Sequence, residues 1–363
     1  MPDALEITVQ TASRTYPVHV GENLVGELDQ LITKAGSTGL RFVVSSPPIW
    51  KLHGAAIRAA LNPTETFLVA DGEQAKTLPT AAQLYDPLIR AGADRSVTLV
   101  AVGGGVLGDM VGLVAATYLR GVQLVHVPTT LLAQVDSSIG GKVGVNHALG
   151  KNLIGAFHQP IAVVTDPRLL ETLPRREFRA GLYEVIKYGV IASRDLFDRI
   201  GRDLKMIVAR QADVLVPIIA ESCRIKASVV AEDEQEKGLR RILNFGHTIG
   251  HAIEAVTGYS RLRHGEAVAF GMQAAAHLSA TRGLLPDSDR DALAQLVAAL
   301  GPLPSVSDLN PDAVAEAIRR DKKVLHGRLH MVLTTALGQT TIVDDVTEAE
   351  IRDSLAAIGI RKS

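Results

Sequence analysis

The sequence predicts an α/β N-terminal domain built on a parallel sheet, followed by a mostly α-helical C-terminal domain. In the first half, short β-branched runs alternate with helical stretches, which is the pattern of a parallel sheet with crossover helices. After about residue 166 the strand signals nearly vanish, and long amphipathic patterns replace them. At about 150 residues per domain, the 363 residues suit two domains, which we expect to span 1–170 and 171–363.

The expected strands of the N-terminal domain are short and almost entirely apolar, which suits a sheet that helices cover on both faces. Helices are expected at 80–91, where Gly92 would follow as the cap residue, and at 107–119. The strands are predicted at residues 40–45, 66–70, 97–102, 122–127 and 162–165.

The C-terminal domain is expected to consist of helices with one short hairpin near its end. The segments 327–333 and 338–343 are typical of a hairpin, and a last helix is expected at about 347–358. The amphipathic patterns before them predict helices at 175–191, 211–232, 248–257, 266–282, 287–299 and 311–320.

Composition and charge exclude several classes of protein. Lys and Arg total 38 against 39 for Asp and Glu, so a net charge of −1 supplies no overall positive field for nucleic acid or an anionic membrane. Hydrophobic residues make up 47% and charged residues 21%, which excludes a disordered or fibrous chain. No apolar run approaches the roughly 18 residues of a membrane span. The single cysteine, Cys223, and the lack of a signal-like segment at the start favour a cytoplasmic location.

A glycine-rich turn is predicted between the strand at 97–102 and the helix that follows it. Residues 102–109 read Val-Gly-Gly-Gly-Val-Leu-Gly-Asp. Glycines let the backbone approach a diphosphate closely, and the free N–H groups of a helix N-terminus bind anions. The spacing departs from the Gly-x-Gly-x-x-Gly pattern, so a plain strand-to-helix turn stays open as the alternative.

A second polar segment follows the strand at 66–70 and contains Asp71, Glu73 and Lys76. It would lie at the carboxyl edge of the sheet, where parallel sheets bind ligands, and its carboxylates could accept hydrogen bonds from ribose hydroxyls. A polar turn without a ligand is the alternative.

Three histidines close together in the sequence favour a metal site. Residues 244–251 read Asn-Phe-Gly-His-Thr-Ile-Gly-His, and Glu254 and His264 follow. His247 and His251 are four residues apart, so on a helix they share one face, and neutral imidazoles so spaced bind zinc or a related ion. Spacing alone makes both of them ligands. Histidines satisfied within a protein core are the alternative.

Basic and polar side chains are scattered through otherwise apolar segments. Each one alone is an ordinary surface charge, and that interpretation stays open. Together they would suit a small phosphorylated anion, which lysine and arginine bind well. The residues concerned are Lys142, Lys151, Asn152, Lys187, Lys226 and Arg240.

The order of these motifs resembles that of the 3-dehydroquinate synthases from about residue 5 to residue 355. The block at 244–251 is the most specific match. The other matching positions are Asp71, Gly72, Glu73 and Lys76; Gly103, Gly104, Gly105 and Asp109; Pro128, Thr129 and Thr130; Asp136, Ser137, Ser138 and Lys142; Lys151 and Asn152; Glu184 and Lys187; and His264, Gly265 and Glu266.

The resemblance implies a Rossmann-like NAD-binding domain, a helical metal-binding domain and a homodimer. It implies that 3-deoxy-arabino-heptulosonate 7-phosphate is converted to 3-dehydroquinate and phosphate in the shikimate pathway. The steps would be alcohol oxidation, phosphate β-elimination, re-reduction and intramolecular aldol closure, so that NAD would be regenerated in each turnover.

The resemblance also assigns residues to metal, cofactor and substrate. Zn²⁺ or Co²⁺ would be held by Glu184, His247 and His264, while His251 would turn to the substrate. NAD would be bound by Asp71, Glu73, Lys76, Gly104, Gly105, Val106, Asp109, Thr129, Thr130, Lys142 and Lys151. The substrate would be bound by Asp136, Lys142, Asn152, Lys187, Lys226, Arg240, Asn244, His251 and Lys323, with Lys322 as the alternative to Lys323.

Other functions on the same scaffold stay open at this point. Cyclases that make inosose, valiolone or amino-dehydroquinate products are the nearest, although Arg240, Asn244 and His251 suit a substrate with a carboxylate better than a neutral sugar. A metal-dependent polyol dehydrogenase would consume NAD and would not need so many lysines. A non-enzymatic metal-binding module would leave the basic residues unexplained. The chain also has Ser45 and Ser46 where relatives commonly carry Asp or Asn beside the adenosine ribose.

Overall fold

A computed structural model of the chain describes residues 4–319, 324–325 and 328–361, which form two compact units. Unit 1 contains the residues up to 178 and the segment 210–235, and unit 2 contains residues 179–209 and those from 236 onward. This division differs from the single boundary predicted at residue 170. The physical reason is that helix α8 (Ala212–Glu232) packs on strands β1 and β2 of unit 1, and an amphipathic pattern does not reveal which domain a helix covers.

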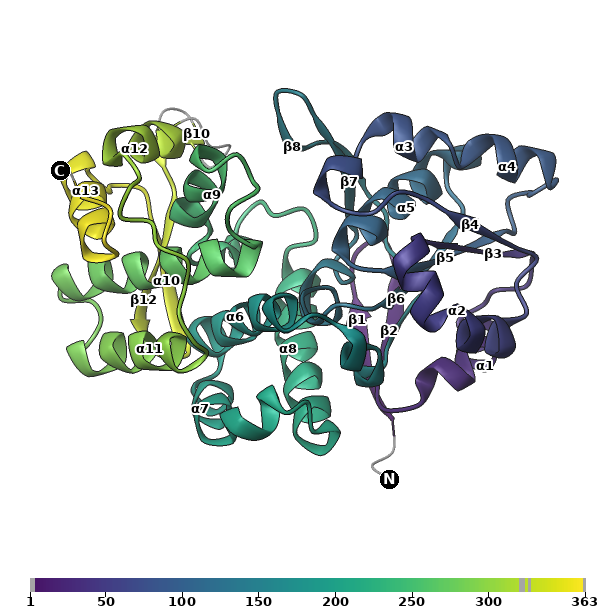
Figure 1. Ribbon diagram of the computed structural model, residues 1–363, viewed down its shortest axis with the longest axis horizontal. Coiled ribbons are helices and arrows are strands. Elements are labelled where there is room, and N and C mark those ends of the chain that lie inside the picture. Colours follow the sequence, from purple (N-terminus) through teal and green to yellow (C-terminus); the bar gives the residue numbers. More distant parts are fainter. Residues whose placement is uncertain (1–3, 320–323, 326–327, 362–363) are drawn as a thin grey trace. The chain divides into compact units, whose positions relative to one another are not determined.

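The core of unit 1 is a seven-stranded sheet in the order β1-β2-β9-β6-β5-β3-β4 (Figure 1). Only β1 and β2 pair antiparallel, and the other neighbours in this sheet pair parallel. The predicted fold class is confirmed, although the sequence analysis misses the β1–β2 hairpin. The strands are β1 (Leu5–Gln10), β2 (Thr15–Val20), β3 (Arg41–Ser45), β4 (Glu65–Leu68), β5 (Thr98–Gly103), β6 (Gln123–Pro128) and β9 (Ala162–Thr165).

Helices cover both faces of this sheet because side chains alternate along each buried strand. Phe42 and Val44 of β3 pack in one core cluster with helix α5 (Gly105–Thr117). Val43, between them, packs in another with α1 (Leu28–Lys34) and α2 (Pro47–Leu61). This two-sided burial accounts for the continuous apolar runs in the sequence.

The strand order reverses direction between β3 and β5. Strand β3 continues through α2 to β4 on one side, whereas β5 continues through α5 to β6 on the other, and the two helices lie on opposite faces. In open α/β sheets, ligands bind beside such a switch point, outside the carboxyl ends of the strands. The end of β3 at Ser45 and the glycine turn after β5 are therefore the expected edge of a binding site.

Shorter elements surround the sheet. The helix predicted at 80–91 is interrupted, because Pro87 has no N–H to donate to the carbonyl of Gln83, four residues earlier. The remaining elements of unit 1 are η1 (Leu24–Glu27), η2 (Glu73–Ala75), α3 (Leu78–Ala82), α4 (Tyr85–Arg90), η3 (Tyr118–Arg120), the π-helical turn η4 (Ala133–Ser137), the hairpin β7 (Lys142–His147) and β8 (Gly150–Phe157), and η5 (Pro167–Thr172).

Unit 2 is mostly helical, as predicted. The sequence analysis misses α7 (Arg194–Val208), which begins after Ser193, where the side chain accepts a hydrogen bond from Leu196 N. In the described part of the chain no helix is both long and apolar enough to cross a membrane. The other elements are α6 (Arg175–Ala192), which starts in unit 1, η6 (Leu239–Asn244), α9 (His247–Val256), α10 (His264–Thr281), α11 (Asp287–Ala299), α12 (Pro311–Arg319), β10 (Val324–Leu325), β11 (Arg328–Leu329), β12 (Met331–Ala336), β13 (Gln339–Val343) and α13 (Glu348–Ala357).

Helices α9 and α10 touch through glycines at the centre of unit 2. A Cβ on Gly271 of α10 would overlap the carbonyl oxygen of Gly246 and lie 2.9 Å from the backbone nitrogen of Gly250. Gly246 also has a φ of +78°, which L side chains rarely adopt. The two helix backbones are therefore in direct contact, and only glycine allows this approach.

We predict that Gly271→Ala destabilises the protein by about 3 kcal/mol or more, because the added methyl meets backbone that cannot rotate away. Gly201→Ala in α7 is the matched control, since the nearest atom to its new Cβ would be Leu296 Cδ1 at 4.0 Å. That variant is expected to gain about 0.5–1 kcal/mol from the lower backbone entropy of the unfolded chain. Urea unfolding measures both, and equal stabilities for the two variants would contradict the close contact.

Candidate functional site

The glycine turn of unit 1 joins β5 directly to α5. Gly104 is the N-cap residue of α5, and a Cβ on Gly105 would lie 2.7 Å from Ser137 Oγ. At the end of the neighbouring strand, Thr129 N donates to Gly103 O at 3.0 Å, and the buried Thr129 Oγ1 has no hydrogen bond among the described residues. A helix N-terminus without side chains, next to a hydroxyl that lacks a partner, can bind an anion such as a phosphate group. Val106 and Thr130, also predicted to bind NAD, adjoin this turn.

A buried lysine lies at the centre of the polar cluster beside this turn. Lys76 is 4% exposed, and its Nζ donates at 2.6 Å to Asp109 Oδ2 and at 2.6 Å to Asn152 Oδ1. Burial raises the pKa of the Asp109 carboxyl, and Lys76 opposes that shift because it stabilises the charged form. Asn152, which the sequence analysis assigns to the substrate, therefore contacts a residue assigned to NAD.

Asn146 holds the same cluster together, and the sequence analysis misses it. Its Nδ2 donates to Glu73 Oε1 at 2.8 Å, its backbone N–H donates to Lys76 O at 2.8 Å, and its Oδ1 accepts from Asn152 N at 2.9 Å. Lys151 Nζ lies 3.7 Å from Glu73 Oε1. Nothing in the local sequence marks Asn146, because its contacts depend on how the β7–β8 hairpin folds over η2.

At the switch point, Asp71 is fixed by hydrogen bonds. Its Oδ2 accepts from Ser46 Oγ at 3.1 Å and its Oδ1 accepts from Gly72 N at 2.7 Å. Ser45 Oγ donates to Val102 O at 2.9 Å, which ties the end of β3 to β5. Ser46 therefore holds the carboxylate of Asp71 at the edge of the sheet, while Ser45 holds β3 to β5.

A second ion pair in unit 1, between a buried lysine and a partly exposed carboxylate, joins α8 to the π-helical turn η4. Lys226, which is 5% exposed, donates to Asp136 Oδ1 at 2.7 Å and to Asp136 O at 2.5 Å. The same carbonyl oxygen also accepts from Ile139 N at 3.0 Å. Cys223, one turn earlier on α8, donates to Gln134 O at 3.3 Å, and burial raises its pKa to about 12, so this thiol is structural.

In unit 2, three histidines converge from α9 and α10. One ring nitrogen each of His247, His251 and His264 lies within 4.8 Å of those of the other two. The close approach of the helices at Gly250 and Gly271 brings these rings together. His247 and His251 are expected on one face of a helix from their spacing, and both lie on α9.

The carboxylate of Glu184 on α6 lies beside two of these histidines. Glu184 Oε1 is 3.6 Å from His247 Nε2 and 3.6 Å from His264 Nε2, and it accepts no hydrogen bond among the described residues. Its other oxygen, Oε2, is 2.5 Å from Lys187 Nζ, one turn along the helix. Both side chains are at most 1% exposed. A buried charge of this kind is costly unless a cation neutralises it.

The remaining candidates divide between the units. Arg240 and Asn244 lie on η6, where Arg240 is 2% exposed and Asn244 Nδ2 donates to Glu236 Oε1 at 2.8 Å. Lys322 and Lys323 lie outside the described residues. All predicted NAD ligands belong to unit 1, and all predicted metal ligands belong to unit 2. The substrate candidates in unit 1 are Asp136, Lys142, Asn152 and Lys226. Those in unit 2 are Lys187, Arg240, Asn244 and His251.

Comparison with known proteins identifies the family. Family models described as 3-dehydroquinate synthase N-terminal and C-terminal match residues 66–180 and 181–324. The 3-dehydroquinate synthase of Solibacter usitatus is 44% identical over 349 residues, which is 96% of this chain and 97% of that protein. The chain belongs to the 3-dehydroquinate synthase family. The resemblance drawn from the motifs is confirmed, as is the prediction that the chain is an enzyme of the 3-dehydroquinate synthase class.

Two solved structures of related cyclases share the fold. The 2-epi-5-epi-valiolone synthase of Streptomyces hygroscopicus, with NAD⁺ and Zn²⁺ bound, is 30% identical with a TM-score of 0.86, over 94% of this chain and 96% of that one. A 2-deoxy-scyllo-inosose synthase complexed with carbaglucose-6-phosphate, NAD⁺ and Co²⁺ is 30% identical with a TM-score of 0.85, over 96% and 98% of the two chains. The identity to 3-dehydroquinate synthases is therefore higher than to these two cyclases.

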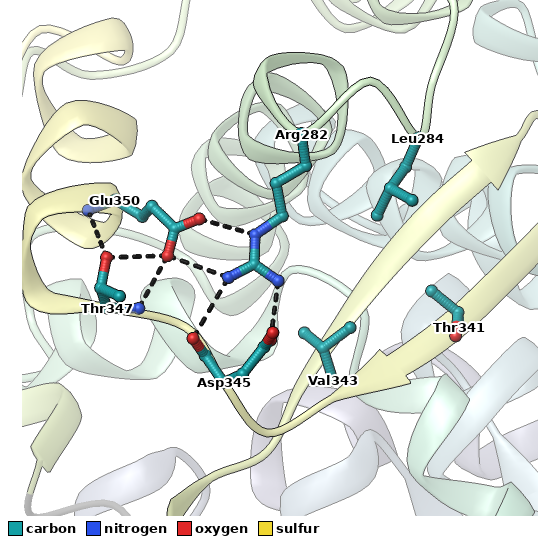
Figure 2. A pocket seen from close by; sticks show the side chains of 7 residues that line it. All are labelled: Arg282, Leu284, Thr341, Val343, Asp345, Thr347 and Glu350. Atoms are coloured by element: carbon teal, nitrogen blue, oxygen red, sulfur yellow. Dashed lines mark hydrogen bonds and ion pairs between the residues drawn. The ribbon is translucent and has the colours of Figure 1, made fainter.

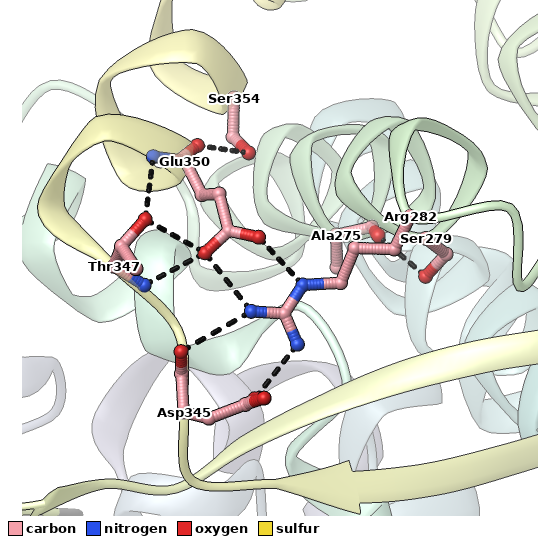
Figure 3. Close-up of polar contacts among 7 residues, drawn as sticks. All are labelled: Ala275, Ser279, Arg282, Asp345, Thr347, Glu350 and Ser354. Carbon is pink, nitrogen blue, oxygen red and sulfur yellow. Dashed lines mark hydrogen bonds and ion pairs between the residues drawn. The ribbon is translucent and has the colours of Figure 1, made fainter.

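A surface hollow of unit 2 contains none of the residues predicted for this family's site (Figure 2). Its centre is Arg282, whose Nε and Nη2 donate to the two oxygens of Glu350 at 2.6 and 2.9 Å and whose Nη1 donates to Asp345 at 2.7 Å. Figure 3 shows that Glu350 also accepts from the backbone nitrogen of Thr347, the N-cap residue of α13. This network joins the end of α10 to the start of α13, so we interpret it as structural.

A small cavity lies beneath the glycine turn of this 3-dehydroquinate synthase family member and is lined partly by His126. The pKa of His126 is lowered from 6.5 to about 4, mainly by burial. The nearby His158 lowers it further. The unfolded chain therefore binds a proton at a higher pH than the folded protein does. It follows that stability from this group is complete above pH 6.5 and decreases as pH falls toward 4.

The unchanged protein should lose unfolding free energy when the pH falls from 7.5 to 5. We predict that this loss is smaller in His126→Leu by about 2 kcal/mol. Urea unfolding at the two pH values measures this difference. The same pH dependence in both proteins would show that His126 does not carry the effect.

Proposed function

We propose that the chain converts 3-deoxy-arabino-heptulosonate 7-phosphate to 3-dehydroquinate and phosphate, as a member of the 3-dehydroquinate synthase family. The observation that carries this proposal is the convergence of His247, His264 and the buried Glu184 carboxylate, whose Oε1 accepts no hydrogen bond among the described residues. In the matching family motif, these are the residues expected to hold the metal. A small phosphorylated sugar as substrate agrees with this family.

The donor set fits a four-coordinate divalent ion. Donors bound to zinc at about 2.1 Å in a tetrahedron lie about 3.4 Å apart, close to the 3.6 Å from Glu184 Oε1 to each Nε2. Glu184, His247 and His264 would hold Zn²⁺ or Co²⁺, and His251 would face the substrate. The bound ion would supply a Lewis acid that makes a substrate hydroxyl more acidic. Lys187, in contact with Glu184 Oε2, leaves Oε1 as the oxygen available to the ion.

The glycine turn and its polar neighbours fit NAD. The N-terminus of α5 would receive the diphosphate, because Gly104 and Gly105 have no side chain that blocks it and Thr129 Oγ1 needs a donor or acceptor. Asp71, at the switch point, would accept hydrogen bonds from a ribose. NAD would supply an acceptor and later a donor of hydride. The ion pair of Lys76 and Asp109 keeps both side chains oriented at the edge of this turn. The full cofactor set would be Asp71, Glu73, Lys76, Gly104, Gly105, Val106, Asp109, Thr129, Thr130, Lys142 and Lys151.

Buried basic side chains would bind the substrate. Lys187, Lys226 and Arg240 are each at most 5% exposed, so their charges are poorly solvated and interact strongly with an anion. A substrate with both a phosphate and a carboxylate carries anionic groups of the kind that lysine and arginine bind well. The full substrate set would be Asp136, Lys142, Asn152, Lys187, Lys226, Arg240, Asn244, His251 and Lys323.

We also propose a homodimer in the cytoplasm. The homodimer follows from the family alone. The cytoplasmic location is supported by the single cysteine, which is buried at 0% exposure and has no partner for an intrachain disulfide. Sedimentation of the purified protein would test the oligomeric state.

The decisive assay is phosphate release from 3-deoxy-arabino-heptulosonate 7-phosphate with catalytic NAD⁺, before and after chelation of metal. We expect metal-dependent phosphate release without net NADH absorbance, because the hydride is returned within each turnover. A NAD⁺ concentration far below that of the substrate should sustain the reaction to completion.

Each other outcome points to a different activity. Phosphate release from a hexose or heptulose phosphate without a carboxylate, in place of the expected substrate, would favour the inosose or valiolone cyclases that share the fold. Accumulation of NADH with a simple polyol would favour a dehydrogenase. Binding of metal and NAD⁺ without turnover of any substrate would overturn the proposed enzyme activity.

The proposed ligand set predicts different effects of two neighbouring variants on metal affinity. Glu184→Gln should weaken Zn²⁺ or Co²⁺ binding by about 100-fold or more, because it removes the only carboxylate proposed as a ligand. His251→Asn should change metal affinity less than about tenfold while it abolishes turnover. Competition with a chromophoric chelator measures both affinities. A larger loss of metal affinity in His251→Asn than in Glu184→Gln would assign the metal to His247, His251 and His264, as their spacing alone suggests.

A further inference from the structure

The second ring nitrogens of the two histidines beside Glu184 are both held by acceptors. His247 Nδ1 lies 3.1 Å from the backbone oxygen of Phe245, and His264 Nδ1 lies 3.2 Å from Glu254 Oε2. In each ring, Nε2 is the atom that faces Glu184 Oε1. Both imidazoles are thus held with Nε2 toward Glu184, His247 by a main-chain oxygen and His264 by a side chain.

Glu254 reaches His264 because α9 and α10 are packed closely. It follows His247 by seven residues and His251 by three, so the three side chains share one face of α9. The Glu254 side chain is 5% exposed, while the His264 side chain is 31% exposed. A carboxylate buried to this degree is stabilised by a donor, and His264 Nδ1–H is such a donor.

The chemistry of imidazole gives this contact a consequence. When a neutral histidine donates from Nδ1, its Nε2 carries the lone pair and is free to bind a metal ion. A carboxylate acceptor also makes Nε2 more basic and prevents rotation of the ring. Without an acceptor at Nδ1, His264 can take the other tautomer, in which Nε2 carries the proton and cannot be a ligand.

We propose that Glu254 is a positioning residue of the metal site, which holds His264 in the tautomer that presents Nε2 beside Glu184 Oε1. The proposal rests on the metal site of the proposed function. Glu254 is not among the metal ligands or substrate contacts that the motifs or the family resemblance imply.

Three variants separate this role from packing. Glu254→Met keeps the volume of the side chain and removes the acceptor, whereas Glu254→Gln keeps an amide oxygen that accepts from Nδ1–H. Glu316→Gln on α12, a helix packed on α9, is the control for loss of a carboxylate elsewhere in the unit, because Glu316 is exposed. Metal affinity is measured for Zn²⁺ and Co²⁺ by chelator competition, and the tautomer of His264 by ring ¹⁵N chemical shifts in the metal-free protein.

We expect Glu254→Met to weaken metal binding by about 10–100-fold and to move the His264 ring shifts toward the other tautomer. Glu254→Gln should retain the shifts and lose less affinity, and Glu316→Gln should leave both unchanged. Unchanged affinity in Glu254→Met would overturn the proposal. A loss of affinity without a change in the His264 shifts would also overturn it, because the loss would then come from packing.

These readouts do not depend on turnover. Metal binding that responds to Glu254 in a protein that releases no phosphate from the substrate would overturn the proposed function and support the role of Glu254. If Glu254→Met changes neither phosphate release nor metal affinity, the proposed function is supported and the role of Glu254 is overturned.

Discussion

The site in unit 2 depends on the direct contact between the backbones of α9 and α10. Gly271 and Gly246 leave no space for a side chain between the helices, and the contact brings histidines from two separate segments around one carboxylate. Glu184 comes from a third helix, and its burial is tolerable because Lys187 and the imidazoles surround it. Packing and electrostatics are therefore coupled, since a wider spacing of α9 and α10 would move the imidazoles away from the buried carboxylate.

Ion pairs with a buried lysine are the common element of both units. Lys76 with Asp109 and Lys226 with Asp136 lie beside the sheet of unit 1, as Lys187 with Glu184 lies in unit 2. Each pair holds a long, flexible side chain in one position, so little further ordering is needed when an anionic ligand arrives. A buried pair adds little stability by itself, so its value is in positioning.

Much of this arrangement could be predicted from the sequence because the signals are local. The glycine turn at 103–105 and the histidines on one helix face follow from spacing, and the five strands β3, β4, β5, β6 and β9 follow from their apolar runs. Contacts between distant segments could not be predicted. Asn146 acts only where the β7–β8 hairpin folds over η2, and Glu254 meets His264 only because two helices are in contact. The assignment of α8 to unit 1 likewise depends on which surface it covers, which amphipathicity does not specify.

The division of the chain into 1–178 with 210–235, and 179–209 with the remainder, has a consequence for synthesis on the ribosome. The strands β1 and β2 are made first, yet the helix that covers them, α8, is completed about 210 residues later. Unit 1 cannot close its core until that helix has left the exit tunnel, and a whole segment of unit 2 is made in between. A nascent chain that stops near residue 170 would leave uncovered the apolar surface of β1 and β2 on which α8 packs, which makes it a ligand for chaperones.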